Sequence, residues 1–281
     1  MNARNPMNQR DFVDAVRQHF DAVADAVLAA LTADEAATLN LSAEETLFVR
    51  FNSNQVRQNT NVEQISMALQ LQSNVKGEGR TVEMSRTLSG QWDTDQAAML
   101  ALLAQCRAEI AVLPADPHQV PVENHGSSDE TFSGQLLAAD AVVDAVVGPA
   151  QGCDMAGLYA AGSIIRANRN SKGQRHWFAT QTFFMDYSLY NGSRAVKGSY
   201  AGSDWQHDEW AANLAHSKHL LALMDKPLQT VKPGQYRTYL APRAVADLVG
   251  MMGWNALSGS AWKQGRSPSF QINCLRGQFA L

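Results

Sequence analysis

The chain has 281 residues, of which 45% are apolar and 18% are charged, so it is long enough for two domains and apolar enough to bury sizeable cores. Its formal net charge of -4, without a cluster of Lys or Arg, disfavours binding to phosphate backbones, and we expect no nucleic-acid partner. The three cysteines form no Cys-x-x-Cys pair, and no apolar run reaches the length of a signal-peptide core or a membrane span. We therefore expect a cytoplasmic protein with no membrane partner.

Residues 1–115 predict a first α+β domain. Apolar residues from Phe12 to Leu31 recur at steps of three and four, which predicts a helix capped by Asn8. Alternating apolar residues and a glycine-rich turn predict an antiparallel meander, with strands over 46–51, 59–73 and 82–88. A helix over 93–113, capped by Asp93, completes this domain.

Residues 116–133 are rich in Pro, Ser, Asp and Glu, which predicts an exposed linker, and residues 134–228 predict a central α+β domain. The elements expected there are a helix over 134–147, strands over 158–166, 176–187 and 188–200, and a helix from Asp204 to about Asp225. Asp204 is the expected cap of the last helix. The aromatic residues between Trp177 and Tyr187 alternate, so we expect one face of that strand to be core and the other to be available to an extended peptide.

Residues 229–281 predict the start of a third domain. The Pro233-Gly234 pair predicts a turn that leads into a strand over 236–240, and Pro242 is placed to open a helix that runs to Asn255. The fold class is therefore α+β, with two helix-flanked antiparallel sheet units followed by an incomplete third, β-rich domain.

The order of these elements resembles the TldD/PmbA family, whose members were once called modulators of DNA gyrase and are now described as zinc-dependent peptidases. The resemblance rests on three segments: Arg50-Phe51-Asn52 through Thr60, Gly157 through Trp177, and Lys232-Pro233-Gly234 through Pro242. Lys197 and Tyr200-Ala201-Gly202, before the predicted long helix, also fit the family's pattern. It implies a role in proteolysis or peptide maturation. The resemblance ends near residue 268, so the chain is interpreted as lacking the family's C-terminal domain, which would leave the strand over 236–240 exposed and favour association.

In the family's peptidases, a His-Glu-x-x-x-His motif just after the Pro-Gly turn and the following proline binds zinc. The matching residues here, 247–255, contain no histidine, and Asp247 alone cannot hold zinc. The resemblance therefore implies a non-catalytic subunit of the TldE/PmbA type, with no catalytic, cofactor or metal residues of its own. The implied partners are a zinc-bearing TldD-type chain, in a hetero-oligomer, and an extended peptide that pairs with a sheet edge.

Two alternatives stay open. The weak fallback metal site is His216 with His219, which share one side of a predicted helix and would make the chain an active metallopeptidase if an acidic ligand came from elsewhere. His207 and Glu209 lie too far along the same helix to join them. A standalone interaction or regulatory module, without a catalytic partner, is the other alternative.

Overall fold

The computed structural model describes residues 9–75, 78–227, 229–253 and 256–267, and it confirms the α+β class. The chain forms two compact units, Met1–Pro227 and Leu228–Leu281. The predicted cap Asn8 lies outside the described residues. Among the described residues, no helix has both the length and the apolar character that crossing a membrane requires.

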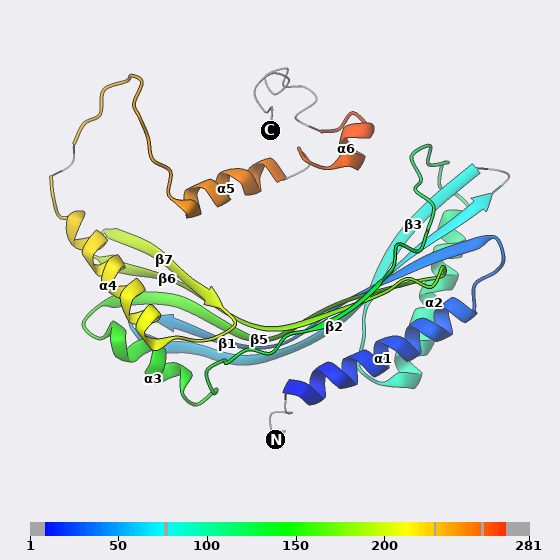
Figure 1. The fold of residues 1–281 in the computed structure, drawn as a ribbon, viewed down its shortest axis with the longest axis horizontal. Helices are drawn as coiled ribbons and strands as arrows, with labels where there is room; N and C mark the ends of the chain where they lie inside the picture. Colours follow the sequence, from blue (N-terminus) through cyan, green and yellow to red (C-terminus); the bar gives the residue numbers. More distant parts are fainter. Residues whose placement is uncertain (1–8, 76–77, 228, 254–255, 268–281) are drawn as a thin grey trace. The chain divides into compact units, whose positions relative to one another are not determined.

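The first unit is built on one seven-stranded sheet, whose strands run in the order β3-β2-β1-β5-β6-β4, with β7 paired to β6 (Figure 1). The strands are β1 (Glu35–Asn52), β2 (Gln55–Val75), β3 (Glu78–Thr87), β4 (Ser127–Thr131), β5 (Asp154–Asn170), β6 (Arg175–Asn191) and β7 (Arg194–Gly202). All neighbours are antiparallel except β4 and β6, which are parallel. The two expected sheet units are therefore two ends of a single sheet, joined by the long strands β1, β5 and β6.

Helices cover one face of this sheet, and within Met1–Pro227 no described helix packs against the other face, which we call the open face. The first helical layer, α1 (Gln9–Ala29) and α2 (Trp92–Ile110), packs at one end of the sheet, and the second, α3 (Val142–Val147) and α4 (His207–Leu223), packs at the other (Figure 1). Odd-numbered positions of β1, β5 and β6 supply the residues that these strands bury under the two layers; on β1 these are Leu39, Leu41 and Ala43 at one end and Val49 and Phe51 at the other, with half-buried Glu45 and Leu47 between them. Because side chains alternate along a strand, the even-numbered positions of these strands lie on the open face.

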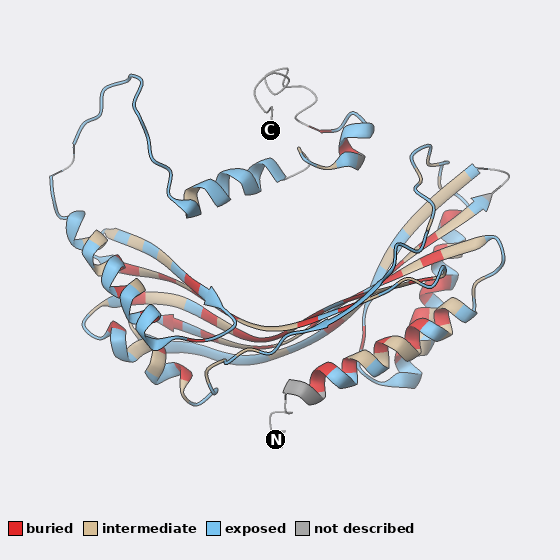
Figure 2. Ribbon diagram, in the orientation of Figure 1, coloured by how far each residue is buried: buried red, intermediate tan, exposed pale blue. Residues whose placement is uncertain are grey.

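The two helical layers enclose separate hydrophobic cores, visible as buried positions at both ends of the sheet (Figure 2). The first core joins the apolar stripe of α1, from Phe12 to Val27, to β1 and β2. The second joins Trp210 and Leu214 of α4 to an aromatic group from β5, β6 and β7. Burial of these side chains, at about 25 cal/mol per Å² of apolar surface, is the main force that fixes both layers on the sheet.

The sheet bends between its two ends (Figure 1). Gly162 of β5 lies between Ala161 of the second core and Ile165 of the first. A Cβ atom at Gly162 would lie only 1.9 Å from the backbone oxygen of Glu45 on β1. Glycine in a strand interior weakens the strand, but it permits a close approach of two backbones. Here it lets β5 pair closely with β1, where Gly162 lies opposite Thr46, without a steric clash.

Several expected boundaries differ from the structure. The expected linker contains β4, which pairs with Arg175–Ala179 of β6. The helix expected over 134–147 begins only at Val142, because the preceding residues follow β6: the Phe132 N–H donates to the Ala179 oxygen (2.8 Å), and the Gly134 N–H donates to the Gln181 side chain (3.0 Å). Neither Asp93 nor Asp204 is an N-cap: Gln91 and Gln206 occupy those positions.

The second unit contains two helices among its described residues, α5 (Pro242–Gly253) and α6 (Gly259–Lys263). Pro242 is the first residue of α5, as predicted. The N–H groups in the first turn of a helix have no acceptor within the helix, so a proline, which lacks this N–H, is tolerated there. The strand expected over 236–240 is not formed, and this correction leaves the described residues of the unit without a strand. The expected end of the helix at Asn255 lies outside the described residues.

Candidate binding groove on the open face of the sheet

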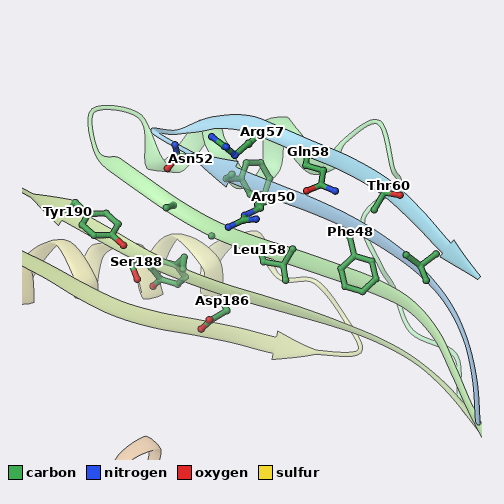
Figure 3. Close-up of a pocket in the computed structure, with 15 residues that line it drawn as sticks. Phe48, Arg50, Asn52, Arg57, Gln58, Thr60, Leu158, Asp186, Ser188 and Tyr190 are labelled. Atoms are coloured by element: carbon green, nitrogen blue, oxygen red, sulfur yellow. The ribbon is translucent and has the colours of Figure 1, made fainter. Parts of the chain in front are cut away.

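The candidate site is a groove of about 720 Å³ on the open face, over the end of the sheet that carries α3 and α4 (Figure 3). Side chains from four adjacent strands line it: Phe48 and Arg50 from β1, Arg57, Gln58 and Thr60 from β2, Leu158 from β5, and Asp186, Ser188 and Tyr190 from β6. The positions from β1, β5 and β6 are even-numbered, so they lie opposite the second core.

A β-bulge places two arginines on the same side of the groove. The β1–β2 hairpin turns at Ser53 and Asn54, both with positive φ (50° and 56°), as a two-residue hairpin turn requires. Arg50 pairs with Gln58, whereas the next residue of β1 pairs with Val56, so Arg57 is an extra residue in β2. In a β-bulge, two residues of the bulged strand lie opposite one residue of its partner. Arg57 and Gln58 therefore both lie opposite Arg50, and all three line the groove (Figure 3).

The acidic side chain in the lining is already paired. The Lys197 ammonium of β7 lies 2.9 Å from Asp186 Oδ2. Arg50 and Arg57, by contrast, are exposed, and neither has a hydrogen bond or ion pair with any residue in the described part of the chain. The groove therefore presents two guanidinium groups whose charge no nearby carboxylate balances.

Apolar side chains form the rest of the lining. Phe48 and Leu158 lie side by side, and Tyr190 lies at the other end of the groove (Figure 3). Gly157 of β5 contributes only backbone to the lining, and it lets β5 and β6 lie close together: a Cβ atom there would lie 2.6 Å from the Asp186 backbone oxygen. An extended ligand with both apolar and anionic groups fits this combination of surfaces.

The groove borders a free strand edge. β3 pairs with β2 only over Ser66–Val75, so Gln55–Gln64 have β1 on one side and no described strand on the other. The Leu88 N–H donates to the Ile65 oxygen (2.8 Å), which shows that the backbone of Ile65 is directed away from β1. Because backbone direction alternates along a strand, Glu63 and Asn61 also direct their N–H and C=O groups to the free edge.

The predicted fallback metal ligands are apart from this groove. His216 and His219 are both exposed on α4, which packs on the sheet through Trp210, Leu214 and Ser217 instead. Within the described residues, no group of three or more His, Cys, Asp or Glu side chains could hold a metal ion. Asp247, the acidic residue in the segment matched to the zinc motif, is exposed on α5.

The aromatic residues of β6 divide between the two faces, as their alternation predicts. Trp177, Phe183 and Tyr187 are buried, whereas Phe178 and Phe184 are 39% and 43% exposed. The two exposed rings belong to even-numbered positions and so add to the open face.

The fold is an α+β fold in which helices cover one face of a long, bent antiparallel sheet, and solved structures share it. The chain matches a "putative modulator of a DNA gyrase" from Thermotoga maritima MSB8 with a TM-score of 0.64 and 14% identity, over 89% of this chain and 58% of that one. A "putative modulator of DNA gyrase" from Bacteroides thetaiotaomicron VPI-5482 matches with a TM-score of 0.59 and 14% identity, over 88% and 58%. TldE from Thermococcus kodakarensis matches with a TM-score of 0.48 and 9% identity, over 74% and 47%.

The first two likenesses confirm, at the level of the fold alone, the predicted resemblance to proteins called modulators of DNA gyrase. No family model and no curated protein sequence matches the chain. The chain spans less than two thirds of the length of these solved structures.

Sequence reasoning identified the segment of the groove but not the groove itself. Arg50 and Arg57 belong to the first segment of the family resemblance, where they carry no assigned role. The bulge that brings them together depends on the pairing of β1 with β2, and the hairpin turn is the available signal: Ser53-Asn54 between two polar-apolar strands is compatible with a two-residue loop.

Proposed function

We propose that this chain is a cytoplasmic, non-catalytic, peptide-binding component of a TldD/PmbA-type peptidase complex, with the catalytic zinc on a partner chain. Its role would be in proteolysis or peptide maturation. The observation that carries the proposal is the free edge of β2, Gln55–Gln64, beside the groove on the open face. The activity, the partner and the substrate all belong to the proposal.

The free edge offers backbone groups to an extended peptide. A peptide that adds as a strand can hydrogen-bond to the outward N–H and C=O groups of Asn61 and Glu63, and these bonds recognise its backbone rather than its sequence. Alternate side chains of that peptide would then project over the open face, beside Thr60 and Val62, which line the groove. Edge strands are commonly blocked by Pro or Lys, and residues 55–64 contain neither.

The non-catalytic assignment rests on the sequence of α5. In the family that the chain resembles, the corresponding helix carries the zinc ligands, whereas α5 has Asp247 as its acidic residue and no His, Cys or Glu. A chain of this kind can shape a binding surface while its partner supplies the metal-activated water. The exposed pair of His216 and His219 remains the alternative site.

The peptide-binding part is tested by blocking the edge. Asn61→Pro removes one outward N–H, a position where a strand tolerates proline, and should weaken binding of a fluorescein-labelled ten-residue peptide about fivefold or more. Asn61→Ala, which keeps the N–H, is the matched control and should bind as the wild type does. Fluorescence anisotropy gives both affinities, and equal binding by both variants would remove the edge from the proposal.

The partner is tested separately by co-purification with a zinc-bearing TldD-type chain encoded in the same genome, followed by metal analysis. We expect zinc to follow the partner and the His216→Ala, His219→Ala double variant to have the same metal content as the wild type. Stoichiometric zinc on this chain alone, lost in the double variant, would instead support the active-metallopeptidase alternative.

A further inference from the structure

The charges around the groove point to one class of ligand. Among the residues that line it, the charged ones are Arg50, Arg57 and Asp186. Lys197 offsets the charge of Asp186. Asp154 pairs with the lining residue Tyr190, and Glu63 follows the lining residue Val62, but neither carboxylate lines the groove. Among the lining residues, those from β1 and β2 therefore carry only positive charge.

We propose that Arg50 and Arg57 bind a carboxylate of the peptide, so that the groove selects acidic peptide segments or the C-terminal end of a peptide. This inference rests on the proposed peptide-binding function and names its substrate class. A guanidinium group donates two parallel N–H bonds to a carboxylate, which makes arginine better suited than lysine to this task.

The geometry puts both arginines within reach of a peptide on the β2 edge. Arg57 lies on β2 itself, and Arg50 lies one strand further in, since it pairs with Gln58. Adjacent strands are separated by about 4.8 Å, so a peptide strand on the free edge would lie about 10 Å from the backbone of β1. Figure 3 shows the Arg50 side chain over the groove, and Arg57 near the hairpin turn at its end.

The other surfaces of the groove agree with an anionic ligand that is also partly apolar. Phe48 and Leu158 lie beside Arg50 and can contact the apolar atoms of the residues next to the carboxylate. Asp186 lies in the cross-strand row of Arg50 and Leu158, and its ion pair with Lys197 limits its repulsion of a second carboxylate.

The test compares four fluorescein-labelled decapeptides that differ in one acidic group at a time: a central Glu or Gln, each with a free or an amidated C-terminus. We expect the wild type to bind at least one carboxylate form about tenfold more tightly than the neutral, amidated Gln peptide in low salt, and the preference to shrink as ionic strength rises. If tight binding requires the central Glu, the side chain supplies the carboxylate. If it requires the free C-terminus, the C-terminus supplies it.

The variants are Arg50→Gln, Arg57→Gln and their combination, with Arg86→Gln as the matched control. Arg86 is an exposed arginine on β3 that does not line the groove. The ratio of the affinity for the carboxylate peptide to that for the neutral peptide should fall about threefold to fivefold in each single groove variant. In the double variant the ratio should fall nearly to one, and in Arg86→Gln it should stay as in the wild type. Circular dichroism and thermal melting verify that these surface variants stay folded.

The outcomes separate this inference from the function on which it rests. If the neutral peptide binds as tightly as the acidic ones, or if the preference survives in the double variant, the carboxylate site is wrong while peptide binding at the β2 edge stands. If none of the four peptides binds, peptide binding itself is contradicted, and the carboxylate site with it.

Discussion

Asp95 connects α2, α1 and the loop before α2 through one buried carboxylate. It is 2% exposed, and its two oxygens accept bonds from the Ser89 N–H and hydroxyl (2.8 and 2.9 Å) and from the Gly90 N–H (2.8 Å). His19 Nε2 of α1 lies 2.8 Å from Asp95 Oδ2. Burial acts to raise the pKa of Asp95, but the hydrogen bonds from Ser89, His19 and Gly90 outweigh it, so this pKa is lowered.

The lowered pKa of Asp95 makes its contribution to stability pH-dependent. A carboxylate with a depressed pKa in the folded state stabilises the protein above its unfolded pKa of about 3.9, and the stabilisation is lost as pH falls through the folded pKa. Asp95→Asn should therefore lower the free energy of unfolding by about 1–3 kcal/mol at pH 7. The difference from the wild type should narrow below about pH 4.

Urea denaturation at pH 7, 5 and 3 measures both the size and the pH dependence of this effect. Asp93→Asn is the matched control, because Asp93 is an exposed carboxylate in the first turn of the same helix. Its replacement should change stability by no more than about 0.5 kcal/mol. A pH-independent difference for Asp95→Asn would show that the carboxylate acts only through its shape.

At the scale of elements, β1 and β2 place two like charges opposite each other. Glu45 pairs with Glu63 across β1 and β2, between the two cores. Burial, and then the charge of Glu63, raise the pKa of Glu45. Like charges directly opposite each other in an antiparallel pair are destabilising. Because protonation of Glu45 removes the repulsion, the strain is absent at low pH and appears as pH rises through the raised pKa.

Glu63→Lys should therefore stabilise the protein at pH 7, by about 0.5–1 kcal/mol in the free energy of unfolding, and the gain should vanish when Glu45 is protonated. Chemical denaturation at pH 7 and pH 3 measures it. Glu83→Lys on β3 makes the same charge change opposite Gln70, where no carboxylate lies across the strand. A gain of the same size in Glu83→Lys would attribute the effect to net charge instead of the cross-strand pair.

The sequence predicted the elements in which apolar residues recur with a clear helical or strand period. The stripe from Phe12 to Val27 predicts α1, and alternation predicts the apolar part of β2. The first half of β1 was missed although Ala37, Leu39, Leu41 and Ala43 alternate with polar residues and are buried. This alternation covers only four apolar residues, two of them small, and the strand is defined by its pairing with both β2 and β5. β4 was missed for the same reason: all its residues are exposed and only its pairing with β6 defines it.

The groove could be predicted only in part, for a related physical reason. The sequence correctly predicted that the aromatic residues of β6 divide between a core face and an exposed face, because that pattern is local to one strand. The placement of Arg57 beside Arg50 in the groove depends on a bulge between strands, and the free edge of β2 depends on where β3 ends. Neither property can be read from a single segment of sequence.

At the scale of the whole molecule, the two units differ in how much apolar surface they bury. Both hydrophobic cores lie within Met1–Pro227, whereas α5 in Leu228–Leu281 has no buried residue. Several large apolar side chains of the second unit are exposed, among them Leu248 (47%), Val249 (53%) and Met251 (67%). Exposed apolar surface of this kind favours association.

We therefore expect a chain of residues 1–227 to fold by itself and to keep the cooperative melting transition of the full chain, because it retains both cores. We also expect it to associate less with rising concentration, because it lacks the exposed apolar residues of α5. Differential scanning calorimetry and multi-angle light scattering on both chains measure the two effects.

A shorter chain without a cooperative transition would show that the cores need the second unit. Equal light scattering from both chains would mean that the apolar residues of α5 do not drive association, and a monomeric full chain would contradict the predicted association outright.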